Sequence, residues 1–131
     1  RIIKGGIFES FSVTNEVIPV DALLAPIIPT DILCVGLNYH AHALETQSEV
    51  PANPMLFIKS SNALHDPGAP IVLPKNSDEV DFEGELVVVI GKTARHVSPE
   101  RALEYVLGYT VGNDVSARGN RRGTSIRRGA C

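Results

Sequence analysis

The chain has 131 residues, of which 44% are hydrophobic and 21% are charged. This is long enough for one domain with a core, and the composition is typical of a globular chain rather than a disordered one. The net charge is −3, but the last thirteen residues hold four arginines and no acid, which leaves −7 on residues 1–118. An acidic body suits a metal site and argues against nucleic acid as the main partner.

The cysteines and the hydropathy exclude further classes of protein. Cys34 and Cys131 fit neither a disulfide framework nor a zinc spacing. Cys34 lies in the apolar run Ile32–Val35, where we expect an inert core thiol in a reducing compartment. No stretch reaches the ~18 apolar residues of a membrane span. We therefore expect no membrane partner, and no signal peptide is expected either.

Residues 1–29 are expected to form an N-terminal segment and a connector. Short alternating segments flank the pair Gly5-Gly6, which predicts one or two short strands with a turn. Three prolines mark the connector that follows: Pro19, Pro26 and Pro29. The run Ile32–Val35 then predicts a short buried strand that ends at Gly36.

A short helix is expected after this strand. Asn38 is a favourable N-cap residue. His42 and Glu45 are three residues apart and would share one face of the helix. Such a pair suits a general acid/base couple, although an ordinary surface histidine beside a glutamate remains an open alternative. His40 would lie on another face, so we expect it to take no part.

Two short apolar runs follow the helix. Met55–Ile58 predicts a strand, and Lys59 stands at its end. A lysine there either reaches a carboxylate or an anionic substrate, or is simply solvated. Ile71–Leu73 predicts a second short strand, which Pro74 would stop.

The segment Asp81–Gly91 predicts the central β-strand. Its run Val87–Ile90 is typical of a sheet that is buried on both faces. Asp81, Glu83 and Glu85 would line one face, with Cα atoms about 6.6 Å apart at each step. At an effective dielectric constant of ~20, two carboxylates at that separation repel by roughly 2.5 kcal/mol. A bound hard cation such as Mg²⁺ would relieve this repulsion, and a solvated edge strand is the alternative.

A second helix is expected to open with Ser98 as its N-cap and Pro99 at its first position. Its buried stripe would consist of Ala102, Leu103, Val106 and Leu107. Gly108 is well placed to end this helix. Tyr109–Val115 then predicts another strand.

Asp114 lies near the end of that last strand. A carboxylate here would complete a three-oxygen set with Glu83 and Glu85, leaving the other coordination positions to water or substrate. A turn-forming aspartate is the alternative. We find no serine or cysteine nucleophile motif, so the sequence does not support covalent acyl transfer.

Together these motifs resemble the fumarylacetoacetate hydrolase superfamily, and within it most closely the domain-containing branch. The resemblance covers about residues 30–118. It rests on Gly36–Tyr39 with His42 and Glu45, on Asp81–Leu86, Val89–Lys92 and Gly108–Thr110, and on Asn113–Arg118. It implies an α+β fold, namely a β-rich roll of mixed sheets with short helices.

The resemblance also implies a chemistry. A divalent cation, Mg²⁺ or Mn²⁺, would be held by three carboxylates: Glu83, Glu85 and Asp114. His42 and Glu45 would lie on a lid helix that delivers water or a proton, and Lys59 matches a lysine at a strand end. The family acts on small 2-oxo or β-diketo acids by C–C hydrolysis, oxaloacetate decarboxylation or keto–enol tautomerisation. All these reactions need an enolate, which the cation stabilises as a Lewis acid.

The resemblance further implies a homodimer and a cytoplasmic or mitochondrial location. Its motifs end at Arg118, and residues 119–131 form a basic tail with neither a strand period nor a helix period. The family continues with roughly as much chain again, so we expect an incomplete roll with residues 30–118 as its N-terminal half. Two hypotheses remain. The chain is a metal-dependent enzyme on 2-oxo acids, or it is an inactive truncated fragment that at most binds metal or intact subunits.

Overall fold

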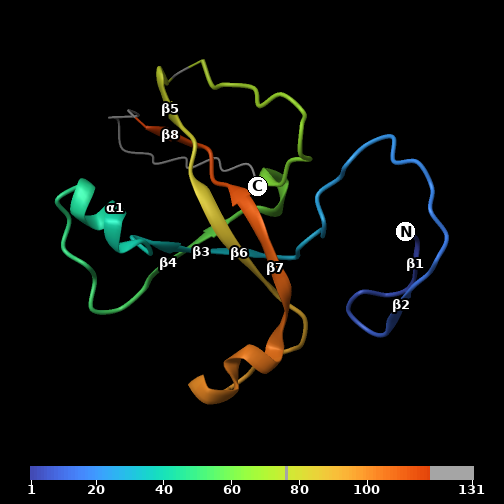
Figure 1. The fold of residues 1–131 in the computed structure, drawn as a ribbon. Helices are drawn as coiled ribbons and strands as arrows, with labels where there is room; N and C mark the ends of the chain where they lie inside the picture. Colours follow the sequence, from blue (N-terminus) through green and yellow to red (C-terminus); the bar gives the residue numbers. More distant parts are fainter. Residues whose placement is uncertain (76, 119–131) are drawn as a thin grey trace.

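The computed structural model describes residues 1–75 and 77–118. Over these residues the strands pair in four antiparallel two-stranded sheets (Figure 1). The pairs are β1 (Ile3–Gly5) with β2 (Phe11–Val13), β3 (Ile32–Gly36) with β4 (Met55–Lys59), β5 (Glu79–Asp81) with β8 (Ser116–Arg118), and β6 (Gly84–Ile90) with β7 (Val106–Asn113). The helices are α1 (His40–Glu45) and the 3-10 helices η1 (Ser61–Ala63) and η2 (Pro99–Tyr105). The fold is therefore strand-rich with few helices, in the α+β class.

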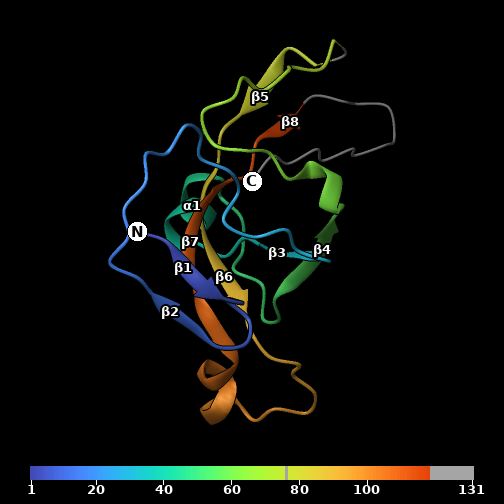
Figure 2. The ribbon, with the colours of Figure 1, turned by 90° about the vertical axis from the view of Figure 1, so that its right-hand side faces the viewer.

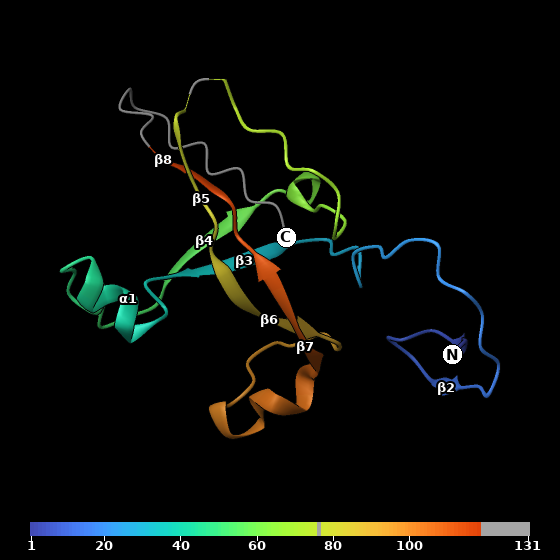
Figure 3. The same cartoon turned by 45° about the horizontal axis from the view of Figure 1, so that its top comes forward.

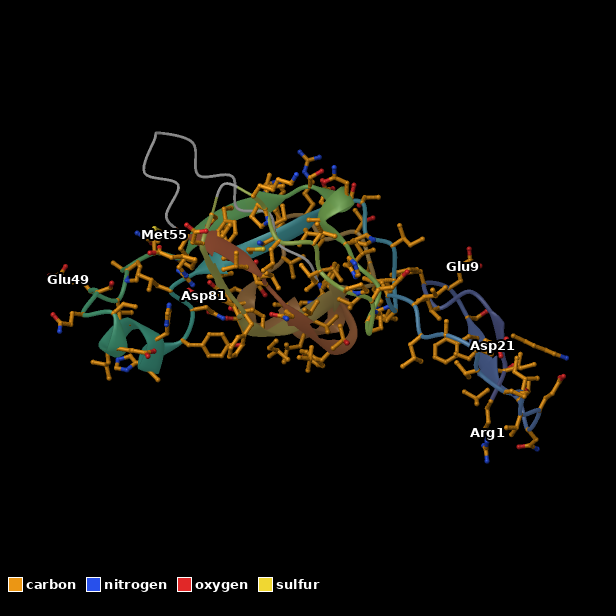
Figure 4. All side chains as sticks on the ribbon, turned by 90° about the horizontal axis from the view of Figure 1, so that it is seen from above. Arg1, Glu9, Asp21, Glu49, Met55 and Asp81 are labelled. Atoms are coloured by element: carbon orange, nitrogen blue, oxygen red, sulfur yellow. The ribbon has the colours of Figure 1, made fainter. Side chains whose placement is uncertain are left out.

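The β6–β7 hairpin is the longest pairing of the described chain, and β5 and β8 continue it at one end (Figure 2). The β3–β4 pair lies across it, and α1 projects beyond one end of that pair (Figures 1 and 3). The β1–β2 hairpin stands apart from the rest (Figure 3). Seen from above, Arg1, Glu9 and Asp21 all lie far from Asp81 (Figure 4). The β1–β2 hairpin end of the N-terminal segment, where these residues lie, is thus separated from Asp81.

Several predicted strands are confirmed with small changes in their bounds. β1 and β2 form the N-terminal hairpin, and β3 covers the apolar run that ends at Gly36. β4 includes Lys59 as its last residue. Ile71–Leu73 is not a strand, and Val72 is 91% exposed. Prolines flank this segment closely and lack the N–H that a ladder needs, which accounts for the wrong prediction.

The central acidic segment forms two strands and not one. β5 ends at Asp81 and β6 begins at Gly84, so Glu83 lies in the break between them. There the Glu83 N–H donates to the side-chain oxygen of Asn113 at 3.1 Å, in place of a regular backbone partner. Asp81 consequently belongs to a different sheet from Glu85.

The expectation that β6 is buried on both faces is also wrong for the described chain. Its residues alternate: Glu85, Val87 and Val89 are partly buried, whereas their neighbours are exposed. Those exposed side chains are Leu86 at 62%, Val88 at 45% and Ile90 at 57%. The opposite strand comes very close on the covered side. A Cβ added to Gly112 would lie 2.9 Å from Val87 Cγ2, so a larger residue there would displace the Val87 side chain.

Both helix predictions need correction. α1 begins one residue later than expected, with Tyr39 and not Asn38 at its N-cap, and no side chain caps it. The second helix is the 3-10 helix η2, which ends at Tyr105 and has no buried stripe. Val106, Leu107 and Gly108 belong to β7. The Gly91 N–H donates to the Tyr105 carbonyl at 2.8 Å. Residues 106–108 therefore pair with β6 as part of a strand, and the helix ends before them.

Little of the described chain is fully buried. The buried apolar residues are Ala43 and Val115, and the buried polar residues are Lys59, Asp114 and Ser116. The accessible surface is 11027 Å², whereas a compact monomer of this mass exposes about 6,700 Å². None of the described helices has the length and hydropathy to cross a membrane. The predicted basic tail, residues 119–131, lies outside the described residues.

Candidate active site

Three acidic side chains gather where β6 begins and β7 ends. The Asp114 N–H donates to the Glu83 carbonyl at 2.7 Å, which places these two residues opposite one another across the hairpin. Glu85 follows two residues later in β6, paired with Gly112. The sequence predicted that Asp114 stands near a strand end, and the structure confirms it.

The surroundings of Glu85 shift the pKa of its carboxyl. Burial raises the pKa of its carboxyl above the ordinary value, and the Tyr39 hydroxyl opposes that shift. The negative charges of Glu83 and Asp114 raise the pKa further, and His42 lowers it. The pKa of Glu85 therefore depends both on the neighbouring carboxylates and on two residues at helix α1, Tyr39 and His42.

Lys59 forms an ion pair with Asp114 through the Oδ1 atom. The lysine is 3% exposed, so it is not a solvated residue at a strand end. Its ammonium group also lies 5.8 Å from the centroid of the Phe57 ring. The sequence left a carboxylate and solvent open as alternatives, and the structure selects the carboxylate.

Arg118 is a site residue that the sequence did not single out. Its guanidinium group pairs through Nη2 with Glu83 and through Nε with Asp81. The contact keeps Asp81 and Glu83 side by side, as the strand pattern predicted, whereas Glu85 belongs to a different sheet from Asp81. The available signal was that Arg118 is the one base in the motif Asn113–Arg118. No sequence period connects it with Glu83, since β5 and β8 pair only in the folded chain.

The donor set suits a hard divalent cation, because Mg²⁺ and Mn²⁺ prefer carboxylate oxygens. Glu83, Glu85 and Asp114 supply three such groups along the lining of one cavity. In this structure Glu83 and Asp114 direct one oxygen each to a protein cation, Arg118 and Lys59. Over residues 1–75 and 77–118, no three acidic, histidine or cysteine side chains stand close enough to enclose an ion. The residues fit a metal by chemistry, and its binding requires their side chains to turn.

Helix α1 brings a second pair of groups to the site. His42 Nδ1 lies 3.7 Å from Glu45 Oε2, which confirms that both share one helix face. Their side chains are 48% and 80% exposed. The Tyr39 hydroxyl accepts a hydrogen bond from the Leu86 N–H at 3.1 Å, so the start of α1 is joined to β6.

These groups surround one open cavity of approximately 1860 Å³. It is lined by His42, Lys59, Glu83, Glu85, Asp114 and Arg118, among others. Glu45 does not line the cavity, but it lies beside His42, which does. The volume exceeds the about 300–1,000 Å³ of most small-molecule sites, since the described chain leaves one side open.

Comparison with known proteins gives a consistent picture. The family model described as fumarylacetoacetate (FAA) hydrolase C-terminal matches residues 31–127, a range that continues past Arg118. A fumarylacetoacetate hydrolase domain-containing protein 2 homolog from Dictyostelium discoideum is 52% identical over 109 residues, which is 82% of this chain and 36% of that protein. The mitochondrial oxaloacetate tautomerase of Xenopus laevis is 47% identical over 98 residues, covering 74% of this chain and 31% of that protein.

A solved structure agrees with these matches. The 2-hydroxyhepta-2,4-diene-1,7-dioate isomerase from Mycobacterium marinum superposes with a TM-score of 0.79 at 38% identity, covering 100% of this chain and 50% of that one. The chain therefore spans about half of this solved structure and about a third of the two curated relatives. The family match extends over most of the sequence. On these grounds the chain belongs to the fumarylacetoacetate hydrolase family of enzymes.

Proposed function

We propose that the protein is a metal-dependent enzyme that acts on small 2-oxo or β-diketo acids through an enolate. The observation that carries this proposal is that Glu83, Glu85 and Asp114 line the same end of the β6–β7 hairpin, where the other two carboxylates and His42 influence the charge of Glu85. We further infer that the paired sheets form part of a β-roll. The names of the relatives support the substrate class, because oxaloacetate and 2-hydroxyhepta-2,4-diene-1,7-dioate are both small dicarboxylates that interconvert with keto or enol forms.

Each side chain has a role in this scheme. Mg²⁺ or Mn²⁺, when bound by the three carboxylates, supplies a Lewis acid that stabilises the enolate oxygen. His42 removes the proton from the carbon beside the keto group and gives it to the enolate oxygen, which yields the enol. Glu45 orients His42 and stabilises its protonated form. Keto–enol tautomerisation needs only this proton movement, so it is the simplest reaction for the site.

The basic residues act on charge and position. Lys59 holds Asp114 through one carboxylate oxygen and leaves the other available. Arg118 is 43% exposed in its side chain and lines the cavity. A guanidinium group there suits a carboxylate of the substrate, which it can bind in place of Glu83.

The test combines metal uptake with turnover. In the presence of Mg²⁺, the purified chain should accelerate the tautomerisation of oxaloacetate over the reaction without protein. Calorimetry should detect binding of Mg²⁺ to the chain. Glu83→Gln should lower both the affinity and the rate by about 100-fold or more, as removal of a charged ligand does. Glu100→Gln, on the exposed helix η2, is the matched control and should change neither.

A second candidate is a catalytically inactive chain that at most binds metal or intact subunits. The observation that favours it is the large accessible surface, with β6 side chains Leu86, Val88 and Ile90 open to solvent. In that case the chain would bind a hydrophobic dye strongly and show no turnover. Turnover that is abolished by Glu83→Gln would exclude this candidate.

We also infer a homodimer and a cytoplasmic or mitochondrial location. The mitochondrial name of the Xenopus laevis relative supports the second compartment. Open strand faces favour association with a second copy. Sedimentation of the purified chain over a range of concentrations would test the dimer.

A further inference from the structure

Tyr39 connects the short helix to the metal strand. It is the N-cap residue of α1, with an extended backbone at φ −103° and ψ 121°, and no side chain caps the helix. Its own side chain leaves the helix and reaches β6, where the hydroxyl accepts the Leu86 N–H at 3.1 Å. The residue at which α1 starts is therefore attached to the strand that carries Glu85.

The Leu86 N–H belongs to an edge that no strand covers in the described chain. β6 pairs only with β7 over these residues. In an antiparallel ladder, alternate residues direct their N–H groups to opposite edges. The Tyr39 hydroxyl takes the place of a strand partner at that open edge. A phenylalanine would keep the ring but leave this N–H to water.

Backbone strain beside Tyr39 makes the attachment important. Leu37, between β3 and α1, has φ +50°, a left-handed conformation that is unfavourable for leucine. Gln47, after the helix, is also left-handed at φ +51°, but there the Ser48 N–H donates to the Ala43 carbonyl at 2.9 Å in an ordinary helix end. Leu37 has no such explanation. Its conformation persists when both ends of the connection are fixed, and Tyr39 fixes the helical end.

The same hydroxyl faces the carboxylate cluster. A tyrosine hydroxyl accepts hydrogen bonds and has one proton to donate. Here it accepts from Leu86, whose N–H belongs to the peptide group that follows Glu85, and it lowers the pKa of the Glu85 carboxyl. His42, three residues further along, acts on Glu85 through its charge. One group thus joins the helix start to the strand edge, next to the candidate metal ligand Glu85.

We propose that the Tyr39 hydroxyl is a positioning group that holds α1, and with it the His42–Glu45 pair, in place over the carboxylates, so that cation binding at Glu85 and the position of α1 are coupled. The coupling rests on the proposed function, whereas the attachment to Leu86 does not. A cation that fixes Glu85 also fixes the adjoining Leu86 N–H to which the hydroxyl is bonded, and by reciprocity an ordered helix favours the cation.

Hydrogen exchange on the full chain tests this, with and without Mg²⁺. Tyr39→Phe should make the amides of residues 43–46, the hydrogen-bonded amides of the helix, exchange about fivefold faster, the effect of one typical net hydrogen bond. Mg²⁺ should slow exchange of these amides in the wild type and not in the variant. Tyr109→Phe, on β7 and 59% exposed, is the matched control and should behave as the wild type. In turnover, Tyr39→Phe should lower kcat about fivefold with KM within twofold.

Three outcomes would overturn the inference. Helix amides that exchange alike in Tyr39→Phe and the wild type without Mg²⁺ exclude the attachment. Faster exchange of the β6–β7 amides by the same factor indicates a general loss of stability and no positioning role. Equal slowing by Mg²⁺ in both proteins excludes the coupling. If the wild type neither binds Mg²⁺ nor turns over substrate, the proposed function fails, and the attachment is still decided by exchange without metal.

Discussion

Lys59 and Asp114 lie 55 residues apart in the sequence and form a buried ion pair, in which the side chains are 1% and 12% exposed. Lys59 ends β4 and Asp114 follows β7, so the pair joins two sheets that share no backbone ladder. The pair also places the positive charge of Lys59 next to Asp114, which is a candidate metal ligand. Removing one member would leave the other buried without a counter-charge.

Lys59→Met should therefore lower the free energy of unfolding by about 3 kcal/mol, as happens when one partner of a buried pair is removed. Chemical denaturation measures this. Lys92→Met, at an exposed position, is the control and should stay within about 0.5 kcal/mol. The double variant Lys59→Met/Asp114→Asn should recover part of the loss. A single variant as stable as the control would contradict the importance of the pair.

Arg118→Gln should strengthen Mg²⁺ binding severalfold. The guanidinium group occupies an oxygen of Glu83, and its removal leaves that carboxylate available to the cation. Since Arg118 is 43% exposed, the cost in stability should be below about 1 kcal/mol. Titration calorimetry measures the affinity.

Arg101→Gln is the matched control for that experiment. Arg101 also pairs with a glutamate, Glu104, on the exposed helix η2. It carries the same charge away from the cavity. Equal strengthening in both variants would show a general effect of net charge rather than competition at Glu83.

The raised pKa of Glu85 predicts a pH dependence of stability in the metal-free chain. Because its folded pKa lies above the ordinary value of 4.5, ionising Glu85 weakens the fold. Its contribution is fully present below the unfolded pKa and is lost as the pH rises through the folded pKa. Glu85→Gln should thus be more stable than the wild type at neutral pH, and the difference should disappear below about pH 4. Denaturation over this pH range measures it.

Glu104→Gln is the natural comparison for Glu85. The pKa of Glu104 is lowered by its bond to Arg101, so any effect there has the opposite sign. The Mg²⁺ affinity should change with pH in the opposite sense to the stability. It should fall as the pH drops through the folded pKa of Glu85, because the cation requires the ionised carboxylate. A Glu85→Gln stability difference that is constant with pH would be inconsistent with the raised pKa.

His42→Asn should lower turnover by about 100-fold or more while the Mg²⁺ affinity changes less than about threefold. The histidine is proposed to move the proton, whereas the carboxylates hold the ion. Glu45→Gln should have a smaller effect of about tenfold, since Glu45 acts only through His42 at 3.7 Å. His40→Asn, in the same helix, is the control. Loss of metal binding in His42→Asn would assign that residue to the ligands instead.

The local elements could be predicted where one short pattern decided them. The β-branched run of β6, the apolar run of β3 and the spacing of His42 and Glu45 all depend on neighbours in sequence, and each is present. Predictions failed where pairing overrode local preference. Val106 to Gly108 fit a helix end but follow β6 into a ladder. The strand break at Glu83 follows from a side-chain hydrogen bond with Asn113, thirty positions away.

By itself the sequence determined the family, the kinds of side chain available for catalysis and the acidic character of the site, because these depend on residue identity and order. Only the tertiary structure decided which charges meet. Lys59 forms an ion pair with Asp114, and Arg118 forms ion pairs with Glu83 and Asp81. The Tyr39 hydroxyl accepts a hydrogen bond from β6. Each of these contacts joins segments at least 35 residues apart. Sequence periods of two or 3.6 residues carry no information at that range, and only the pairing of strands brings such groups together.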